Sequence, residues 1–438
     1  MNSPHTAEIA GLAAREQAQS ILHEVIDRAR KLDEVLEYHS KFNKLHDRDR
    51  AFAHNLVATT LRRLGQIDAA IEDRLNRPLP RSASAVRNAL RLGVCQLLYL
   101  QTPAHAAVDT AVELIGRSGP DKFKGLVNAI LRQLVRDGPV KLAQKYPERT
   151  NVPDWLWQSW KESFGVDVAT NIGAVHLQTP PLDLTTRETP DIWATTLGGL
   201  RIGKSTVRLP VRSDITVLDG FENGAWWVQD AAAALPAQIL TSALPAGRIC
   251  DLCAAPGGKT AQLAAAGHNV TAVDISPKRI RILDANMCRL GLRANMIEAN
   301  ALNWEPTEKF DAVLVDAPCS ATGTIRRHPD IPHLKSVDDV IQRARLQTEI
   351  LRRAISLAAP GGIIVYSVCS LEPTEGVEQI EVALNTHSGL EIEPIKSQEI
   401  PDFAECRTSR GFVQTIPTHL QSLGGVDGFF IARLRKKV

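Results

Sequence analysis

Hydrophobic residues recur at helical spacing along the first third of the chain. Apolar positions within residues 18–26 lie three or four residues apart, which places them on one face of a helix. The same spacing returns in residues 52–64 and 90–98, and no strand-like alternation interrupts residues 7–136. The pattern therefore predicts an all-α bundle as the first domain, over residues 1–140.

The hydrophobic pattern changes twice after this bundle. Residues 141–230 hold short apolar runs broken by Gly and Pro, which predicts a small α+β middle domain. From residue 231 onward short apolar runs alternate with helical stretches; the runs end at 249–252, 270–273, 312–315 and 362–366. Such alternation predicts an α/β, Rossmann-like domain over residues 231–438, with a parallel sheet between helices.

Composition excludes several classes of protein. Of 438 residues, 44% are hydrophobic and 23% are charged, which is ordinary for a globular chain. The chain has no run of about 18 apolar residues, so we expect no membrane helix. Charges interrupt the stretch Met1–Gln19, so we expect no secretory signal. Seven scattered Cys favour reduced thiols. We expect a cytoplasmic monomer without a membrane partner.

Net charge carries little information until the chain is divided. The chain carries +2 overall, but residues 1–140 hold 20 Lys and Arg against 16 Asp and Glu. This excess permits an N-terminal domain that faces nucleic acid. Its arginines Arg62, Arg63, Arg87 and Arg91 are candidates for a patch that reads the phosphate backbone, and a solvated helix surface is the equal alternative.

The first chemical motif is the run from Asp251 to Thr260, DLCAAPGGKT, which follows a predicted strand and opens a helix. Adjacent glycines allow a ligand to approach the backbone closely. The spacing matches neither GxGxxG nor a phosphate-binding loop. Asp274 ends the next strand, where a carboxylate can bind ribose hydroxyls. The pair predicts a nucleoside cofactor; a plain strand-to-helix turn with a surface Asp is the alternative.

Two cysteines follow two other predicted strands. Asp316, Pro318 and Cys319 come after the strand at 312–315, and Cys369 comes after the strand at 362–366. A thiolate that adds to carbon 6 of cytosine makes carbon 5 nucleophilic, and a nearby acid stabilises the adduct. Two buried structural thiols are the alternative. The residues alone do not decide which cysteine would be the nucleophile.

No metal site is expected. Cys250 and Cys253 form one C-x₂-C pair, but no second Cys or His cluster of zinc spacing accompanies it.

Together these motifs resemble a known family. DLCAAPGGKT, VDAPCSATGT and YSVCSLEP are similar to three motifs of S-adenosylmethionine-dependent RNA 5-methylcytosine methyltransferases. The N-terminal bundle resembles the antitermination factor NusB, through Asp49-Arg-Ala-Phe and the stretch from Pro103 to Arg132. The combination resembles the bacterial small-subunit ribosomal RNA cytosine-5 methyltransferase B family. The resemblance implies a multidomain fold: a NusB-like bundle, a small α+β linker domain and a Rossmann-like methyltransferase domain.

The resemblance also implies a role for individual residues. S-adenosylmethionine would be lined by Cys253, Ala254, Ala255, Pro256, Gly257, Gly258 and Lys259. Asp274 would bind its ribose, and Asn300 stands near the adenine, where the family usually has Asp. Asp316 would lie between cofactor and target base. Cys369 would be the nucleophile and Cys319 would assist release of the product.

Candidate RNA contacts lie near the second motif. Arg326 and Arg327 follow Cys319 closely and suit phosphates beside the target base. Phe429 and Phe430 are candidates for the wall of a base pocket, with core packing as the alternative.

The predicted function is methylation of carbon 5 of a cytosine in 16S ribosomal RNA, with small-subunit ribosomal RNA as the partner. A tRNA or DNA cytosine-5 methyltransferase is one alternative. A non-catalytic, NusB-type RNA-binding factor is the other.

Overall fold

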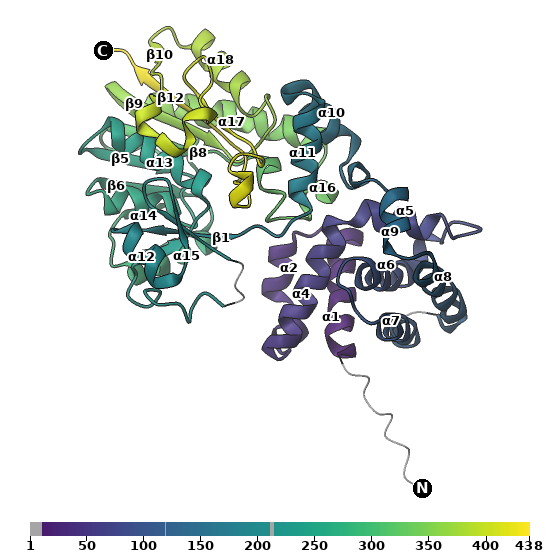
Figure 1. Ribbon diagram of the computed structural model, residues 1–438. Helices are drawn as coiled ribbons and strands as arrows, with labels where there is room; N and C mark the ends of the chain where they lie inside the picture. The colour runs from purple at the N-terminus through teal and green to yellow at the C-terminus, as the bar shows by residue number, and fades with distance from the viewer. Residues whose placement is uncertain (1–10, 119, 211–213) are drawn as a thin grey trace. The chain divides into compact units, whose positions relative to one another are not determined.

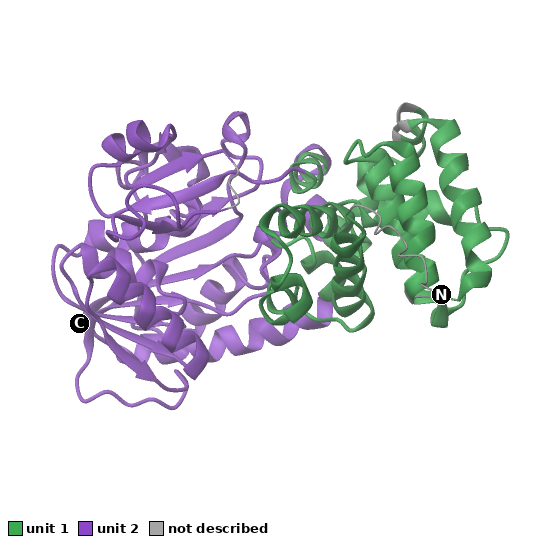
Figure 2. Cartoon of the chain, turned by 90° about the horizontal axis from the view of Figure 1, so that it is seen from below, with its two compact units in different colours: residues 1–158, 169–177, 328–334 green, residues 159–168, 178–327, 335–438 purple. Residues whose placement is uncertain are grey.

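The computed structural model describes residues 11–118, 120–210 and 214–438. Residues 1–10, which carry part of the stretch expected to lack a secretory signal, lie outside the described residues. The chain forms two compact units (Figure 2). Unit 1 comprises residues 1–158, 169–177 and 328–334, and unit 2 comprises residues 159–168, 178–327 and 335–438. The three domains that the sequence suggests are a different division and stay a prediction.

The described part of unit 1 is helical, as the apolar spacing predicts. Its first helices are α1 (Leu12–Leu22), α2 (Leu32–Tyr38), α3 (Ser40–Asn43), α4 (Asp47–Arg62), α5 (Leu64–Glu72), α6 (Ser84–Leu98), α7 (Ala104–Ser118), α8 (Lys124–Asp137) and α9 (Pro139–Lys145). Helices α10 (Asp154–Phe164) and α11 (Val166–His176) follow, and their residues 159–168 are assigned to unit 2. Val86, Leu90 and Val94 form one fully buried stripe of α6. Burial of this stripe holds the helix in the bundle.

One short segment of unit 1 comes from far along the chain. Residues 328–334, including α16 (Ile331–Leu334), lie among the helices of unit 1. The Leu32 backbone N–H donates to Asp330 Oδ2 at 2.9 Å, and His333 Nε2 lies 2.9 Å from Leu61 O. A segment of the predicted catalytic domain thus completes the helical unit, which the hydrophobic pattern did not reveal.

A small antiparallel sheet opens unit 2. Its order is β2-β3-β1-β4, from β1 (Leu182–Thr186), β2 (Leu200–Ile202), β3 (Thr206–Leu209) and β4 (Trp226–Val228), and α12 (Pro190–Leu197) contacts β2 and β3. Leu184, Val207 and Trp226 are buried in its core. Strands and a helix in this stretch agree with the α+β character predicted there.

The larger sheet of unit 2 has the order β10-β12-β9-β8-β5-β6-β7, and β11 pairs with β12 (Figure 1). Its strands are β5 (Arg248–Leu252), β6 (Asn269–Asp274), β7 (Asn295–Glu298), β8 (Phe310–Asp316), β9 (Ala358–Val368), β10 (Leu390–Ile392), β11 (Val413–Thr415) and β12 (Phe429–Lys436). Strands β5 to β9 pair in parallel, and β12 is antiparallel to β9. The predicted Rossmann-like fold is confirmed.

Helices cover both faces of this sheet. They are α13 (Ala231–Ala243), α14 (Gly258–Ala265), α15 (Pro277–Leu290), α17 (Val337–Leu357) and α18 (Val377–Thr386). On β8, Val313 and Val315 pack with α17 and α18, while Ala312 and Leu314 pack with α13. Because successive side chains of a strand point to opposite faces, a strand covered on both faces is apolar throughout.

Candidate active site

The predicted site residues lie at one edge of the large sheet. Cys253 follows β5, Asp274 ends β6, Asp316 ends β8 and Cys369 follows β9. Because these four strands are parallel, their carboxyl ends meet at the same edge. The sheet order changes direction at β5, between β6 and β8, and ligands of open α/β sheets bind at such a point.

The loop after β5 has a backbone conformation that requires glycine at one position. Gly257 has φ +106°, and a Cβ there would lie 3.0 Å from the Leu283 side chain. Glycine therefore permits both the left-handed conformation and the close approach of α15. The loop leads directly into α14, so the first N–H groups of that helix face the edge of the sheet.

Asp274 lies beneath this loop. It is 2% exposed, and it accepts hydrogen bonds from the backbone N–H groups of Ala255 at 3.2 Å and Ser276 at 3.0 Å. Arg279 forms an ion pair with the same carboxylate at 3.2 Å and donates to Ala255 O. The sequence motifs gave no reason to select Arg279, because its partner Asp274 precedes it by a loop and the first turn of α15.

Asn300 is exposed in the turn after β7. Its Oδ1 accepts a hydrogen bond from the Leu302 backbone N–H at 3.0 Å. An amide oxygen has two lone pairs, so one acceptor site remains for a ligand.

Lys259 connects the loop to the end of β8. Its ammonium donates to Asp316 Oδ2 at 2.7 Å and lies 5.4 Å from the centre of the Phe429 ring. The Lys259 side chain is 9% exposed, whereas the Asp316 side chain is 35% exposed. Asp316 is thus held by a buried cation and still faces open space.

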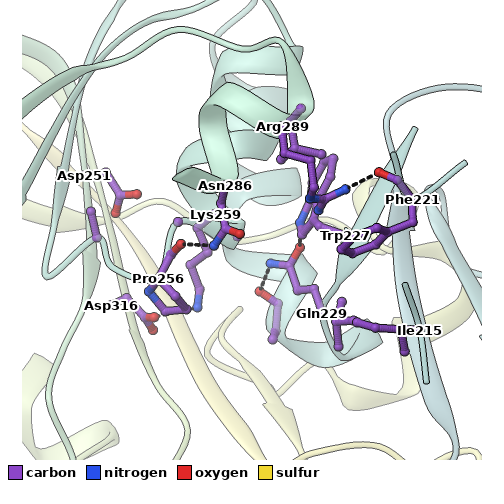
Figure 3. A pocket seen from close by; sticks show the side chains of 16 residues that line it. Ile215, Phe221, Trp227, Gln229, Asp251, Pro256, Lys259, Asn286, Arg289 and Asp316 are labelled. Carbon is purple, nitrogen blue, oxygen red and sulfur yellow. Dashed lines mark hydrogen bonds and ion pairs between the residues drawn. The ribbon is translucent and has the colours of Figure 1, made fainter. Parts of the chain in front are cut away.

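A pocket of about 420 Å³ adjoins this ion pair (Figure 3). Six of the predicted cofactor residues line it: Ala254, Pro256, Gly257, Gly258, Lys259 and Asp316. Cys253, Ala255, Asp274 and Asn300 do not. Phe221, Trp227 and Arg289 form the far wall, and Arg289 donates to Phe221 O at 2.8 Å. The volume is in the range of pockets that hold cofactors.

Asp251 is a fully buried carboxylate on the wall of the same pocket. Its Oδ2 accepts from the Thr260 hydroxyl at 2.6 Å, and its Oδ1 has no hydrogen-bond partner among the described residues. Burial raises the pKa of Asp251 from 3.8 to about 7, and the nearby Asp316 adds to this effect.

The two cysteines are in contact. Cys319 Sγ lies 3.3 Å from Cys369 Sγ, although 50 residues separate them in the sequence. The hydrogen bond with Cys369 and burial raise the pKa of Cys319 well above its usual value. The Cys319 thiol therefore keeps its proton at neutral pH, and either sulfur can be the donor in this contact.

Burial contradicts the phosphate contact predicted for Arg326. The side chain is 1% exposed, and it donates to Asp230 Oδ2 and Asp427 Oδ1, each at 2.6 Å. Arg327 binds the same two carboxylates but keeps 22% of its side chain exposed. Its RNA contact stays a prediction. The two arginines stabilise the fold, because the buried carboxylates of Asp230 and Asp427 require cationic partners.

Three of the four candidate arginines of the N-terminal patch are engaged within unit 1, and the patch itself stays a prediction. Arg91 is 5% exposed and pairs with Asp68 at 2.6 Å, and the Arg63 guanidinium lies 4.9 Å from the Tyr99 ring centre. Burial lowers the pKa of Arg62 to about 10. These three side chains belong to the packing of unit 1.

The candidate base wall is also part of the core. Phe429 and Phe430 are each 3% exposed, and Phe430 packs against Phe412 with ring centres 5.4 Å apart. The alternative of core packing therefore holds for both.

Comparison with known proteins identifies the family. Residues 239–435 match the family model of the 16S rRNA methyltransferase RsmB/F, and residues 12–136 match the NusB family. "Ribosomal RNA small subunit methyltransferase B" of Klebsiella pneumoniae subsp. pneumoniae is 33% identical over 447 residues, covering 97% of this chain and 98% of that protein. The chain belongs to the ribosomal RNA small subunit methyltransferase B family. The resemblance predicted from the motifs is confirmed.

Other members agree with this assignment. The methyltransferase B of Pseudomonas putida is 34% identical over 417 residues, covering 91% of this chain and 93% of that protein. The crystal structure of PH0851 superposes with a TM-score of 0.75 at 22% identity and covers 99% of this chain and all of that one, which supports the fold.

None of the described helices is long and apolar enough to cross a membrane.

Proposed function

We propose that this methyltransferase transfers a methyl group from S-adenosylmethionine to carbon 5 of a cytosine in 16S ribosomal RNA. The observation that carries the proposal is the contact of 3.3 Å between Cys319 and Cys369 at the edge that also holds Asp316. Cytosine-5 chemistry requires one thiol that attacks, one group that assists release and one acid for the ring nitrogen.

The residues at this edge of the sheet fit S-adenosylmethionine, with Asp274 and Asn300 lying outside the pocket beside Asp316. The loop of Gly257 and Gly258 lets a ligand approach the backbone, and Asp274 and Asn300 end or follow the neighbouring strands. When bound, S-adenosylmethionine supplies an electrophilic methyl group. Lys259 holds the Asp316 carboxylate in place at 2.7 Å. We expect the cofactor to lie between this ion pair and the turn of Asn300.

The residues of this chain account for each proton in the reaction. The Cys369 thiol loses its proton to water and its sulfur bonds to carbon 6, while Asp316, which carries a proton in this step, donates it to the ring nitrogen that gains charge. Carbon 5 then accepts the methyl group. As the bond between carbon 6 and sulfur breaks, Cys319 protonates the departing sulfur and takes up the proton lost from carbon 5, and the ring nitrogen returns its proton to Asp316. One proton is released to water per turnover.

Nucleoside analysis tests this function. The wild type is incubated with S-adenosylmethionine and unmodified 16S RNA, tRNA or DNA, and the digested products are separated by mass. We expect 5-methylcytidine from 16S RNA alone. A different methylated nucleoside, or transfer to tRNA only, would reject the proposal. Location in the cytoplasm and a monomeric state stay predictions.

A further inference from the structure

A single buried carboxylate joins the two cysteine loops. Each cysteine is followed by a serine, and both serine hydroxyls donate to Glu375 Oε2; the distance from Ser370 Oγ is 2.5 Å. The Ser320 backbone N–H donates to Glu375 Oε1 at 2.8 Å. Glu375 is fully buried. One side chain thus binds the residue next to Cys319 and the residue next to Cys369.

Other elements hold Glu375 itself in place. Gln347 on α17 donates to Glu375 Oε1 at 3.1 Å and to Pro318 O at 3.0 Å. The Tyr366 hydroxyl on β9 donates to the Glu375 backbone oxygen at 2.7 Å. A buried carboxylate is costly unless donors surround it, so these donors and the charge depend on one another.

A second link joins the same two loops without Glu375. The Leu371 backbone N–H donates to Thr322 Oγ1 at 3.0 Å, and the Gly323 backbone N–H donates to Cys369 O at 3.1 Å. These bonds set the loops side by side. The Ser320 and Ser370 hydroxyls also lie 3.2 Å apart, and Glu375 accepts from both, so its carboxylate orients the two serines together.

We infer that Glu375 is a positioning residue, which holds the Cys319 and Cys369 thiols in contact by binding the serines that follow them. The inference rests on the proposed function only for its effect on turnover, since the contact between the thiols is a property of the fold. Catalytic groups must be held to about 0.5 Å, and a misplacement of about 1 Å can cost about 100-fold in rate.

The first test measures the contact between the thiols without any methyl transfer. Ser370→Ala removes the hydroxyl that donates to Glu375 and that also contacts Ser320, Thr322 and the Glu372 backbone N–H, and it leaves the charge of Glu375. The pH dependence of alkylation by iodoacetamide is followed at Cys319 in the full chain, by peptide mass. Because contact with Cys369 raises the pKa of Cys319, we expect Ser370→Ala to move the midpoint to lower pH. Ser356→Ala, which removes a hydroxyl bonded to Arg353 O, should leave it unchanged. An unmoved midpoint in Ser370→Ala overturns the inference.

The second test measures the effect on turnover. In Glu375→Gln an amide N–H₂ group replaces one carboxylate oxygen. This donor then faces either the serine hydroxyls or the Ser320 N–H, which are donors themselves, so the hydrogen bonds must rearrange. We expect kcat to fall about 100-fold, with the KM for S-adenosylmethionine within about threefold of wild type. Glu399→Gln, which breaks an ion pair with the buried Arg433 elsewhere in the unit, controls for lost stability and should keep kcat. Equal losses of kcat in both variants would overturn the inference. If the wild type lacks methyl transfer, the proposed function fails. The alkylation test still decides whether Glu375 holds the two thiols in contact.

Discussion

The two halves of the candidate site are built in different ways. The half that faces the cofactor comes from a continuous stretch, residues 253–259, in which Gly257 provides the φ of +106° that the turn requires. The half that holds the thiols comes from loops 50 residues apart, joined by Glu375. A continuous stretch determines its own geometry through local conformation. The thiol contact depends on the sheet and on Glu375, which bonds to both loops, so a single substitution in the thiol half should have the larger effect.

The largest expected loss is at the thiols. Cys369→Ala removes the proposed nucleophile, and we expect methyl transfer to fall by about 10⁴-fold or more, as for other covalent catalysts. The rate is measured with radiolabelled S-adenosylmethionine and 16S RNA. Cys288→Ala, at an exposed cysteine of α15, is the matched control and should keep full activity. Activity in Cys369→Ala near the wild-type rate would reject Cys369 as the nucleophile and with it the larger effect expected in the thiol half.

Asp316→Asn tests the residue that the two halves share. The amide keeps the size of the side chain but loses the ion pair with Lys259 and the ability to protonate the ring nitrogen. We expect kcat to fall about 10²–10⁴-fold. Cofactor affinity, measured by calorimetry, should change far less than kcat. A loss confined to cofactor affinity would move Asp316 out of the chemistry.

Asp274→Ala tests the cofactor half alone. Removal of a charged acceptor typically costs about 1.5–3 kcal/mol, so the Kd for S-adenosylmethionine should rise about 10- to 100-fold. At saturating cofactor the kcat should stay within a few fold of wild type. A collapse of kcat at saturation, with the Kd unchanged, would contradict the division between the halves.

The smallest effect on turnover is expected at Asp251, where the signature is pH-dependent stability. The pKa of about 7 exceeds the ordinary value of 3.8, so the folded state holds this proton more tightly than the unfolded state. Stability from this group is present below pH 4 and is lost as the pH rises toward 7, by about 1.4 kcal/mol per pH unit at most. Asp251→Asn cannot ionise, so its stability relative to wild type should increase across that window. Urea unfolding at pH 5 and pH 8 checks this; a constant difference would contradict it.

The same contrast explains what the sequence could predict. Positions such as Asp274 and Asp316 were placed correctly at strand ends, because alternating β and α patterns determine which residues reach the edge of a parallel sheet. Arg326 was placed wrongly because its partners Asp230 and Asp427 lie about 100 residues away, and no local pattern distinguishes a paired arginine from an exposed one. Glu375 was missed for the same reason.

The segment 328–334 shows a further limit. Its sequence continues the predicted catalytic domain, yet Asp330 and His333 bind the backbone of the helical unit. Membership of a unit is decided by which buried polar groups find partners, and hydrophobic spacing carries no record of that. The limits of the predicted domains are therefore less informative than the predicted elements.

Direct detection of the covalent intermediate tests the central claim. Cys319→Ala, incubated with S-adenosylmethionine and 16S RNA, should accumulate a protein–RNA adduct because release is impaired. Nuclease and protease digestion followed by mass spectrometry should find one methylated cytidine bound to the peptide that contains Cys369. An adduct on another residue, or normal turnover without an adduct, would contradict the assignment of Cys369 as nucleophile and Cys319 as the group that assists release.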